Sequence, residues 1–403
     1  MKILSLFDGI SIARQALTNI GIPIEKYYAS EVDKYAIQIA QKNFPDTIQL
    51  GDIRKLRIKH EMLCNGVDCF TYAVVGEIDL IIGGSPCQDL SIAKKDRKGL
   101  DGERSGLFWE YVRILKEVKP KYFVLENVNS MPREAKELIS KTLGVEPVMI
   151  NASLVSAQNR KRLFWVGRLV GDKYEKVEIS QPNDKGILLK DILENYVGDE
   201  YVINPKMMNY KGSNKKSVTI TSTSYKEPPK VIRVGQFNQG GQGDRIYSPE
   251  GKSVGLSALG GGRGAKTGLY AVSKPIILGN EPLQVLKEGR TELGKQSRRE
   301  IRQKTGKDST FRSKGYKAYF GREGIKSNCI TTGLGAEGMV VEDFIIRKLT
   351  PIECERLQSL PDNYTEGISN TQRYKACGNG FNCKVIEHIL TKMKEEVLNG
   401  TKQ

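Results

Sequence analysis

The chain has 403 residues, 39% of them hydrophobic and 27% charged, which is enough for one large or two ordinary globular domains. No run reaches the roughly 18 to 20 apolar residues of a membrane span, and "MKILSLFDGI" is too short and too acidic for a secretion signal, so a cytoplasmic protein without membrane contact is expected. The net charge of +16 is concentrated in residues 201–330, where 25 Lys and Arg face 9 Asp and Glu, which favours a nucleic-acid-binding region over a solvated surface.

The first part of the chain alternates apolar runs with segments of helical periodicity. We expect strands over residues 2–7, 27–33, 78–84, 122–128, 146–153 and 162–169, and helices over residues 11–21, 34–44, 104–119 and 135–144. This alternation predicts a doubly wound α/β domain over residues 1–185, with helices covering a parallel sheet. In such domains ligands bind at the carboxyl ends of the strands.

The composition and the hydrophobic pattern of the sequence change at about residue 186. Short β-like runs, turn residues and glycine clusters such as "NQGGQGDR" predict a second, mainly β domain over residues 186–344. Residues 345–403 return to helical spacing, in "LTPIECERLQSLP" and in the amphipathic "FNCKVIEHILTKMKEEVL". We expect this last segment to pack on the first domain.

The numbers and positions of the cysteines and histidines limit the kinds of site that the chain can contain. The seven cysteines are odd in number and scattered, which fits a reduced compartment better than a disulfide framework. Cys64 and Cys69 lie near His60 but follow no common zinc spacing, so no metal is expected. With only two histidines, catalysis by a histidine base is not expected.

Several polar residues follow strands in the first domain. "LFDGIS" runs from a strand through a glycine turn into a helix, where backbone N–H groups can form a ligand site. Glu31 ends the next strand and can accept hydrogen bonds from ribose hydroxyls, and Asp52 can accept one from an adenine amino group. The set indicates a nucleoside cofactor. The full GxGxxG pattern is missing, which disfavours a nicotinamide-dependent oxidoreductase.

A second group of residues carries reactive chemistry. In "SPCQ", Pro86 fixes the backbone beside Cys87, whose polar, glycine-rich surroundings favour a nucleophile over a buried structural thiol. Glu126 ends the following strand, where its pKa can be raised so that it acts as an acid. Arg160 and Arg162 alternate on an extended segment, so both guanidinium groups can face one site. Together these residues indicate an active site.

An ordered series of motifs now stands out, and it resembles that of the DNA cytosine-5 methyltransferases of bacteria and phages. The resemblance covers the chain outside the basic middle and includes "LFDGIS", "SEVD", "GDI", "GGSPCQDLS", "RSGLFW", "LENV", "QNRKRLF", "RKLTPIECERLQSLP" and "YKACGNGFNCKVI". It implies a Rossmann-like α/β fold that uses S-adenosylmethionine, with the mainly β region as a target-recognition domain. The cofactor residues it implies are Phe7, Asp8, Gly9, Ile10, Glu31, Val32, Asp52, Ile53, Pro86, Leu107 and Asn379.

The reaction follows from the same resemblance. The Cys87 thiolate would add to carbon 6 of cytosine and activate carbon 5 for methylation. Glu126 would hold or protonate ring nitrogen 3, Arg162 would orient the base and Arg160 would support the site. Because a paired cytosine is inaccessible, the base would be flipped out of double-stranded DNA, with residues 91–106 closing over it.

The middle of the chain is similar to the recognition segments of a bacterial member that modifies a GCGC site. On that likeness Gln242 would fill the space left by the flipped base and Arg245 would read a guanine edge, although both could instead contact phosphates. The residues that the resemblance places against nucleic acid are Gln88, Ser91, Gln242, Arg245, Tyr247, Gly261 and Gly262.

The sequence also departs from the family pattern. Ser11 stands where many members have glycine, and "GNGFNCKV" replaces the usual residues after Asn379. About fifty residues, from roughly Ser273 to Lys326, separate the GCGC-like segment from the next motif, so the target sequence is not transferred. Transfer-RNA cytosine methylation, and a non-catalytic nucleic-acid-binding protein on the same scaffold, stay as alternatives. A monomer is expected, with a restriction endonuclease as a possible separate partner.

Overall fold

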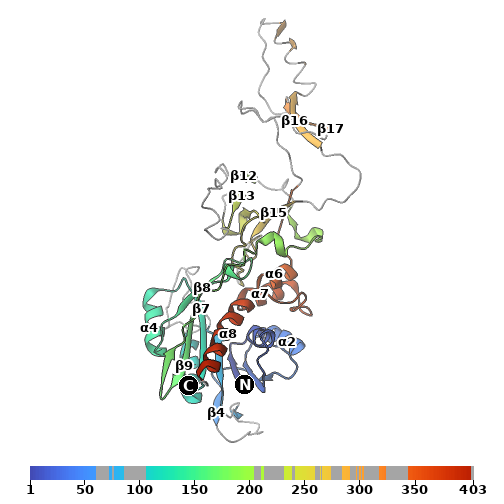
Figure 1. Cartoon of the computed structure of the whole chain (residues 1–403). Helices are drawn as coiled ribbons and strands as arrows, with labels where there is room; N and C mark the ends of the chain where they lie inside the picture. Colours follow the sequence, from blue (N-terminus) through green and yellow to red (C-terminus); the bar gives the residue numbers. More distant parts are fainter. Residues whose placement is uncertain are drawn as a thin grey trace. The chain divides into compact units, whose positions relative to one another are not determined.

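The structure is a computed structural model. It describes residues 1–59, 72–74, 77–85, 106–203, 210–212, 231–237, 241–258, 264, 266–273, 284–290, 296, 299–300, 302–303, 317–323 and 344–400. The chain divides into two compact units, one made of residues 1–271 with 346–403 and the other of residues 272–345 (Figure 1). The domain boundaries expected at residues 186 and 345 stay predictions.

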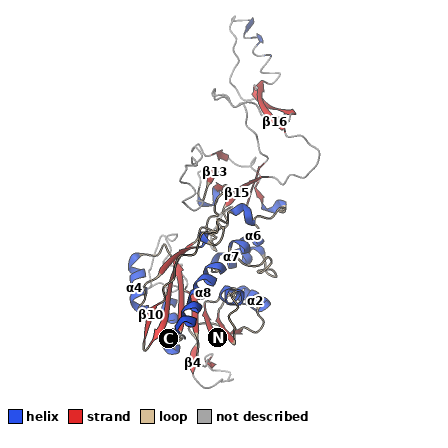
Figure 2. Ribbon diagram, in the orientation of Figure 1, coloured by secondary structure: helices blue, strands red, loops and turns tan. Residues whose placement is uncertain are grey.

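The main sheet of the first unit contains the strands expected in the first domain. Its strands are β1 (Lys2–Leu6), β2 (Lys26–Ser30), β3 (Ile48–Gln49), β6 (Leu80–Gly84), β7 (Tyr122–Val128), β8 (Val148–Asn151), β9 (Lys161–Val170) and β10 (Lys173–Lys176). Among the described residues these eight follow the order β10-β9-β7-β6-β1-β2-β3, with β8 paired to β9. Figure 2 distinguishes the strands (red) from the helices (blue). A short parallel pair, β4 (Arg57–Lys59) with β5 (Tyr72–Val74), stands apart from this sheet.

Helices cover both faces of the main sheet, as the alternation predicted. Alternate strand residues explain this, since Ile3 packs into the core beneath α1, α2 and α8 while Leu4 packs into the core beneath α3 and α4. A strand buried on both faces reads as an unbroken apolar run, which is the pattern of Leu80–Gly84. The helices are α1 (Ile12–Asn19), α2 (Lys34–Asn43), α3 (Leu107–Val118), α4 (Arg133–Leu143) and α8 (Cys383–Gly400).

The expectation of a parallel sheet is wrong at one edge. Strands β3, β2, β1, β6 and β7 are parallel, but β9 runs antiparallel to β7, β8 and β10. Between β8 and β9 the chain makes only a 3₁₀ turn, η2 (Ala152–Leu154), and a short link, too little for the crossover that parallel neighbours need. This antiparallel edge makes the sheet mixed and brings the start of β9 to the carboxyl end of β7.

The final helices return to the first domain, as expected. Helix α6 (Pro351–Leu357) starts at a capping box formed by Thr350 and Glu353, and α7 (Asn370–Asn379) follows. Glu353 also forms a buried ion pair with Arg347 (2.6 Å), whose side chain is 1% exposed. Ile386 and Ile389 of α8 join the same core as α1.

A smaller, mainly β region lies within the described part of residues 186–347. Its sheet has the order β11-β18-β15-β14-β13-β12, and its core holds Phe237, Ile246 and Leu269. The strands are β11 (Val202–Ile203), β12 (Tyr210–Gly212), β13 (Arg233–Phe237), β14 (Arg245–Tyr247), β15 (Leu269–Ser273) and β18 (Phe344–Arg347).

The second unit contains the insertion noted in the sequence. Its described part includes an antiparallel pair, β16 (Gln284–Arg290) with β17 (Lys317–Glu323). A search of the described helices finds none that is long and apolar enough to cross a membrane.

Candidate active site

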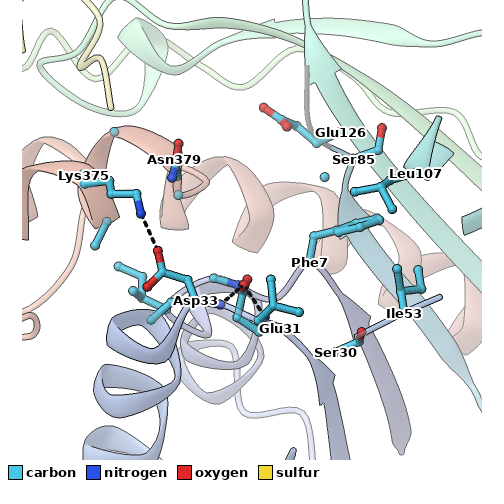
Figure 3. A pocket seen from close by; sticks show the side chains of 18 of the residues that line it. Phe7, Ser30, Glu31, Asp33, Ile53, Ser85, Leu107, Glu126, Lys375 and Asn379 are labelled. Carbon is cyan, nitrogen blue, oxygen red and sulfur yellow. Dashed lines mark hydrogen bonds and ion pairs between the residues drawn. The ribbon is translucent and has the colours of Figure 1, made fainter. Parts of the chain in front are cut away.

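A cavity of about 580 Å³ lies at the carboxyl ends of β1, β2, β6 and β7. This is the edge at which doubly wound sheets bind ligands. Figure 3 shows Glu126 and Ser85 on one side of the cavity, and Asp33 with Lys375 on the other. Of the predicted cofactor residues, the cavity lining includes Phe7, Gly9, Ile10, Glu31, Val32, Asp52, Ile53, Leu107 and Asn379.

The turn after β1 has an unusual backbone. Phe7 (φ 57°), Gly9 (φ 60°) and Ser11 (φ 58°) all lie in the left-handed region, which only glycine occupies without strain. The buried carboxylate of Asp8 accepts hydrogen bonds from the Ser11 hydroxyl and from the Tyr27 hydroxyl (2.8 Å). The bond to Asp8 holds Ser11 in this left-handed conformation, at a position where many members of the resembled family have glycine.

Asp8 is not among the residues that line the cavity, because it is 5% exposed and its side chain points into the protein. Burial raises its pKa to about 6, and the hydrogen bonds from Ser11 and Tyr27 oppose that shift. Its predicted place among the cofactor residues is therefore better described as support of the turn than as contact with the cavity.

Glu31 is fixed by the backbone around it. One carboxylate oxygen accepts the N–H of Gly9 (2.9 Å), and the other accepts those of Val32 (2.7 Å) and Asp33 (2.8 Å). A carboxylate offers about four acceptor positions, so about one is left for a ligand hydroxyl. The arrangement ties the turn after β1 to the end of β2.

The remaining cavity wall combines an acid with apolar side chains. Asp52 forms an ion pair with Arg54 (2.6 Å), whose hydrogen bonds and charge lower the pKa of that carboxyl. Phe7, Ile53 and Leu107 give the same end of the cavity an apolar surface (Figure 3).

Helix α7 supplies a wall that the sequence reading largely missed. Gln372, Lys375 and Ala376 line the cavity beside the predicted Asn379. Residues three or four positions apart lie on one face of a helix, so the spacing of these residues in the sequence could have indicated that they line the same wall. Lys375 also bonds Asp33 (2.6 Å), and this bond lowers the Asp33 pKa against the opposing effect of burial.

Glu126 and Arg162 form an ion pair at the carboxyl end of β7. The Nε atom of Arg162 lies 2.8 Å from Oε1 of Glu126, and both side chains line the cavity. Gly84 makes room for the acid, because a Cβ at that position would lie 3.0 Å from Glu126 Oε2. The antiparallel β9 brings Arg162 opposite Val128, two residues beyond Glu126.

Asn127 fixes the backbone next to the predicted nucleophile. Its buried side-chain amide donates to Oγ of Ser85 (3.1 Å) and to the Ser85 carbonyl (3.4 Å). Ser85 directly precedes the "PCQ" motif. The local sequence gives no sign of this role, because the contact joins residues 42 positions apart.

Arg160 also lines the cavity, but its buried guanidinium is directed at backbone carbonyls. It donates to Gly378 (3.2 and 3.3 Å), to Gly380 (2.9 Å) and to Leu256 (3.5 Å). These bonds join the β9 segment, the end of α7 and a segment near β15.

The other predicted residues divide into two groups. Gln242 is exposed, Arg245 is half-buried and Tyr247 is buried against Tyr270, and none of the three belongs to the cavity lining described above. The predicted residues that lie outside the described part of the chain are Pro86, Cys87, Gln88, Ser91, Gly261 and Gly262.

The described cysteines are buried and unlike a nucleophile. Cys354, Cys377 and Cys383 are free thiols, and burial raises the pKa of each above its ordinary value. A search of the described residues finds no group of three or more His, Cys, Asp or Glu side chains that could hold a metal ion.

Comparisons with known proteins identify the family of the chain. The family model for C-5 cytosine-specific DNA methylase matches residues 1–395. M.SPRI, an orphan methyltransferase of Bacillus phage SPR, is 28% identical over 460 aligned residues, which cover 99% of this chain and 98% of the relative. M.HhaI, a type II methyltransferase of Haemophilus parahaemolyticus, is 25% identical over 400 residues, covering 96% and 93%.

Solved structures show the same fold. The methyltransferase EhMeth of Entamoeba histolytica is 14% identical, with 98% of each chain covered and a TM-score of 0.56. The Dnmt2 methyltransferase of S. pombe is also 14% identical, with 98% and 99% covered and a TM-score of 0.53. With a family match over nearly the whole chain and a Rossmann-like sheet that carries the cavity, the protein belongs to the C-5 cytosine-specific DNA methylases.

Proposed function

We propose that this DNA cytosine-5 methyltransferase takes its methyl group from S-adenosylmethionine and delivers it to a flipped-out cytosine of duplex DNA, through a covalent adduct with Cys87. The observation that carries this proposal is the Glu126–Arg162 ion pair (2.8 Å), which shares one cavity with the Glu31 turn. A nucleoside site and a carboxylate–guanidinium pair at the same edge of one sheet suit methyl transfer to a heterocyclic base.

The residues present fit S-adenosylmethionine. Glu31 can accept a ribose hydroxyl at its remaining acceptor position, while Phe7, Ile53 and Leu107 offer an apolar wall for an adenine ring. Asp52 lines the same end and can accept from an adenine amino group. When bound, S-adenosylmethionine supplies an electrophilic methyl group.

The chain's own residues would perform the remaining chemistry. The Cys87 thiolate forms a bond to carbon 6, and the displaced electron pair makes carbon 5 nucleophilic. Glu126 holds the proton at ring nitrogen 3 as charge develops, and Arg162 fixes the Glu126 carboxylate by its 2.8 Å contact. After methylation carbon 5 would lose its proton to a solvent base, the electron pair of that bond would restore the carbon 5–carbon 6 double bond, and the sulfur would leave carbon 6 as the thiolate.

Recognition would use the mainly β region. Arg245 begins β14, where we propose that it reads a guanine edge, and the exposed Gln242 would fill the space left by the flipped base. The likeness of this segment to a GCGC-modifying member supports these roles, but because of the insertion at residues 273–326 the GCGC target itself is not transferred to this chain.

Transfer of a radiolabelled methyl group to duplex DNA, single-stranded DNA and transfer RNA tests the proposal. We expect duplex DNA to be the preferred substrate, and preference for transfer RNA would support the alternative instead. Glu126→Gln should lower the rate about 100-fold or more, because general acid catalysis and charge stabilisation are both lost. Glu134→Gln, an exposed acid of α4, serves as the matched control and should behave as wild type.

A further inference from the structure

Lys252 is a buried lysine that the proposed reaction does not use. Its side chain is 1% exposed, although it belongs to the basic part of the sequence. In the described part of the chain its ammonium donates to the backbone carbonyls of Ser153 (2.7 Å), Ser156 (3.2 Å) and Ile187 (2.5 Å). A lysine ammonium has three N–H donors and no acceptor, so these carbonyls match its donors one for one.

The environment of Lys252 does not resemble a surface ion pair. Burial lowers its pKa, and the charges of Asp184 and Asp191 oppose that shift from outside hydrogen-bond range. A buried charge is tolerated only when its hydrogen bonds are satisfied, and here the backbone satisfies them. An apolar side chain of similar length would fill the volume but would leave two buried carbonyls and one partly buried carbonyl without this donor. Lys252 therefore cross-links separate stretches of backbone.

The stretches it joins have different roles. Ser153 and Ser156 lie in the turn after β8, a few residues before Arg160 and Arg162. Lys252 lies between β14 and β15, two strands of the sheet in the mainly β region. The cross-link thus connects the proposed recognition region to the turn that leads into the active-site arginines.

The residues after Lys252 strengthen the same connection. The Ser253 N–H donates to the Ala157 carbonyl (2.8 Å), and the Ser253 carbonyl accepts the Asn159 N–H (3.0 Å). Gln158 and Ser253 form a parallel β-bridge. Arg160 then reaches the Leu256 carbonyl. Residues 252–256 therefore run alongside residues 157–160 as a short hydrogen-bonded strip.

Tyr270 extends the strip into β15. Its buried hydroxyl lies 3.1 Å from Oγ of Ser253, accepts the Val254 N–H (3.3 Å) and donates to the Thr267 carbonyl (2.9 Å). A continuous set of hydrogen bonds therefore runs from a strand of the mainly β sheet to the residue next to Arg160.

From these contacts we infer that Lys252 is a positioning residue for methyl transfer, acting through the turn at residues 153–156 to set Arg162 against Glu126. The inference rests on the proposed function of that pair. Lys252 touches neither residue, so its effect is on their placement. Misplacement of a reacting group by about 1 Å can cost about 100-fold in rate, which makes such a cross-link consequential.

The first test is Lys252→Met in the full chain, which keeps the length of the side chain and removes its donors. We expect the turnover rate at saturating S-adenosylmethionine and duplex DNA to fall on the order of 10-fold. The dissociation constant for S-adenosylmethionine should stay within about 2-fold, because the bonds of the Glu31 turn do not involve Lys252. Lys190→Met is the matched control, since this exposed lysine pairs with Glu250 and should leave both values unchanged.

A second variant guards against loss of folding in Lys252→Met. Tyr270→Phe keeps the buried ring and removes only the hydroxyl that contacts Ser253 and Val254. We expect a smaller fall in turnover in the same direction, again with unchanged cofactor affinity. Ile386→Val in the α8 core provides a destabilised variant whose turnover, measured well below its unfolding temperature, should equal that of wild type.

The outcomes separate the inference from the proposed function. Reduced turnover in Lys252→Met, with cofactor affinity retained, supports the positioning role, and a fall in the same direction in Tyr270→Phe supports transmission through residues 252–256. A normal turnover in the folded variants, with only a lower unfolding temperature, would leave Lys252 a purely structural residue and overturn it. A wild-type chain that methylates no cytosine would refute the proposed function and the inference together.

Discussion

Gly378 of α7 sits where three segments of the active-site region meet, and replacing it with alanine is a sharp test of that junction. A Cβ at this position would lie 2.5 Å from the Ala258 nitrogen, 2.7 Å from the Ser257 carbonyl carbon and 2.8 Å from the Ala258 Cα. These are backbone atoms, so no side chain can rotate away to relieve the contact. The Gly378 carbonyl also accepts two hydrogen bonds from Arg160.

The expected size of the effect follows from two opposing contributions. Overpacking a close contact costs about 1–3 kcal/mol, whereas alanine is favoured over glycine in a helix by about 1 kcal/mol. We therefore predict that Gly378→Ala lowers the free energy of unfolding by up to about 2 kcal/mol. Because the shift also displaces an acceptor of Arg160, methyl transfer should fall more than stability alone requires.

Gly380→Ala is the matched control for the stability part of this prediction, and the methyl-transfer rate of Gly378→Ala is compared with wild type because the Gly380 carbonyl also accepts a hydrogen bond from Arg160 (2.9 Å). A Cβ at Gly380 would meet the Cδ1 atom of Ile12 at 2.6 Å, which is the tip of a side chain, and the Ala376 carbonyl oxygen only at 3.3 Å, and the backbone there (φ −70°, ψ 163°) suits alanine. Urea unfolding of both variants, with methyl-transfer rates at saturating substrates, measures the difference. If Gly378→Ala were as stable as Gly380→Ala, the close packing of α7 on residues 257–258 would be refuted.

Three further predictions concern charge. Asp8→Asn should stabilise the protein by up to about 3 kcal/mol at pH 8 and not below pH 4. The native pKa of Asp8, about 6, lies above its ordinary value of 3.8, so ionisation of Asp8 lowers the stability of the native state as the pH rises through that interval. Urea unfolding that shows equal differences at both pH values would contradict this. Changing Arg298, Arg299 and Arg302 to Gln should flatten the salt dependence of DNA affinity by up to about 3 in slope, and an unchanged slope would mean that they face away from DNA. Arg245→Ala should relax sequence choice at one base pair in bisulfite sequencing, whereas uniform weakening across sequences would mark a phosphate contact.

Local pattern was sufficient to predict much of the first domain. Apolar runs and helical spacing identified β1, β6, β7 and their covering helices, because burial on one or both faces leaves a direct mark on the sequence. The direction of β9 could not be predicted from such local patterns. Alternation fixes which face a residue occupies, but strand direction depends on the connection, which here is a short turn.

The site shows the same division. Glu31 and Glu126 were predictable because polar residues at strand ends stand out against apolar runs. Lys252 was counted only as part of a basic surplus, since its burial depends on carbonyls 65 to 99 residues away. The contacts of Arg160 depend in the same way on Leu256 and Gly378, which no local pattern connects to it.

Covalent trapping tests the central claim most directly. Duplex DNA that carries 5-fluorocytosine at the target cannot lose its carbon 5 substituent as a proton, so the adduct should accumulate when S-adenosylmethionine is present. We predict a stable complex that resists denaturation with the wild-type chain, and none with Cys87→Ser. A complex that persists in Cys87→Ser would contradict the assignment of the nucleophile, and the absence of any complex from an active wild-type enzyme would contradict the covalent route.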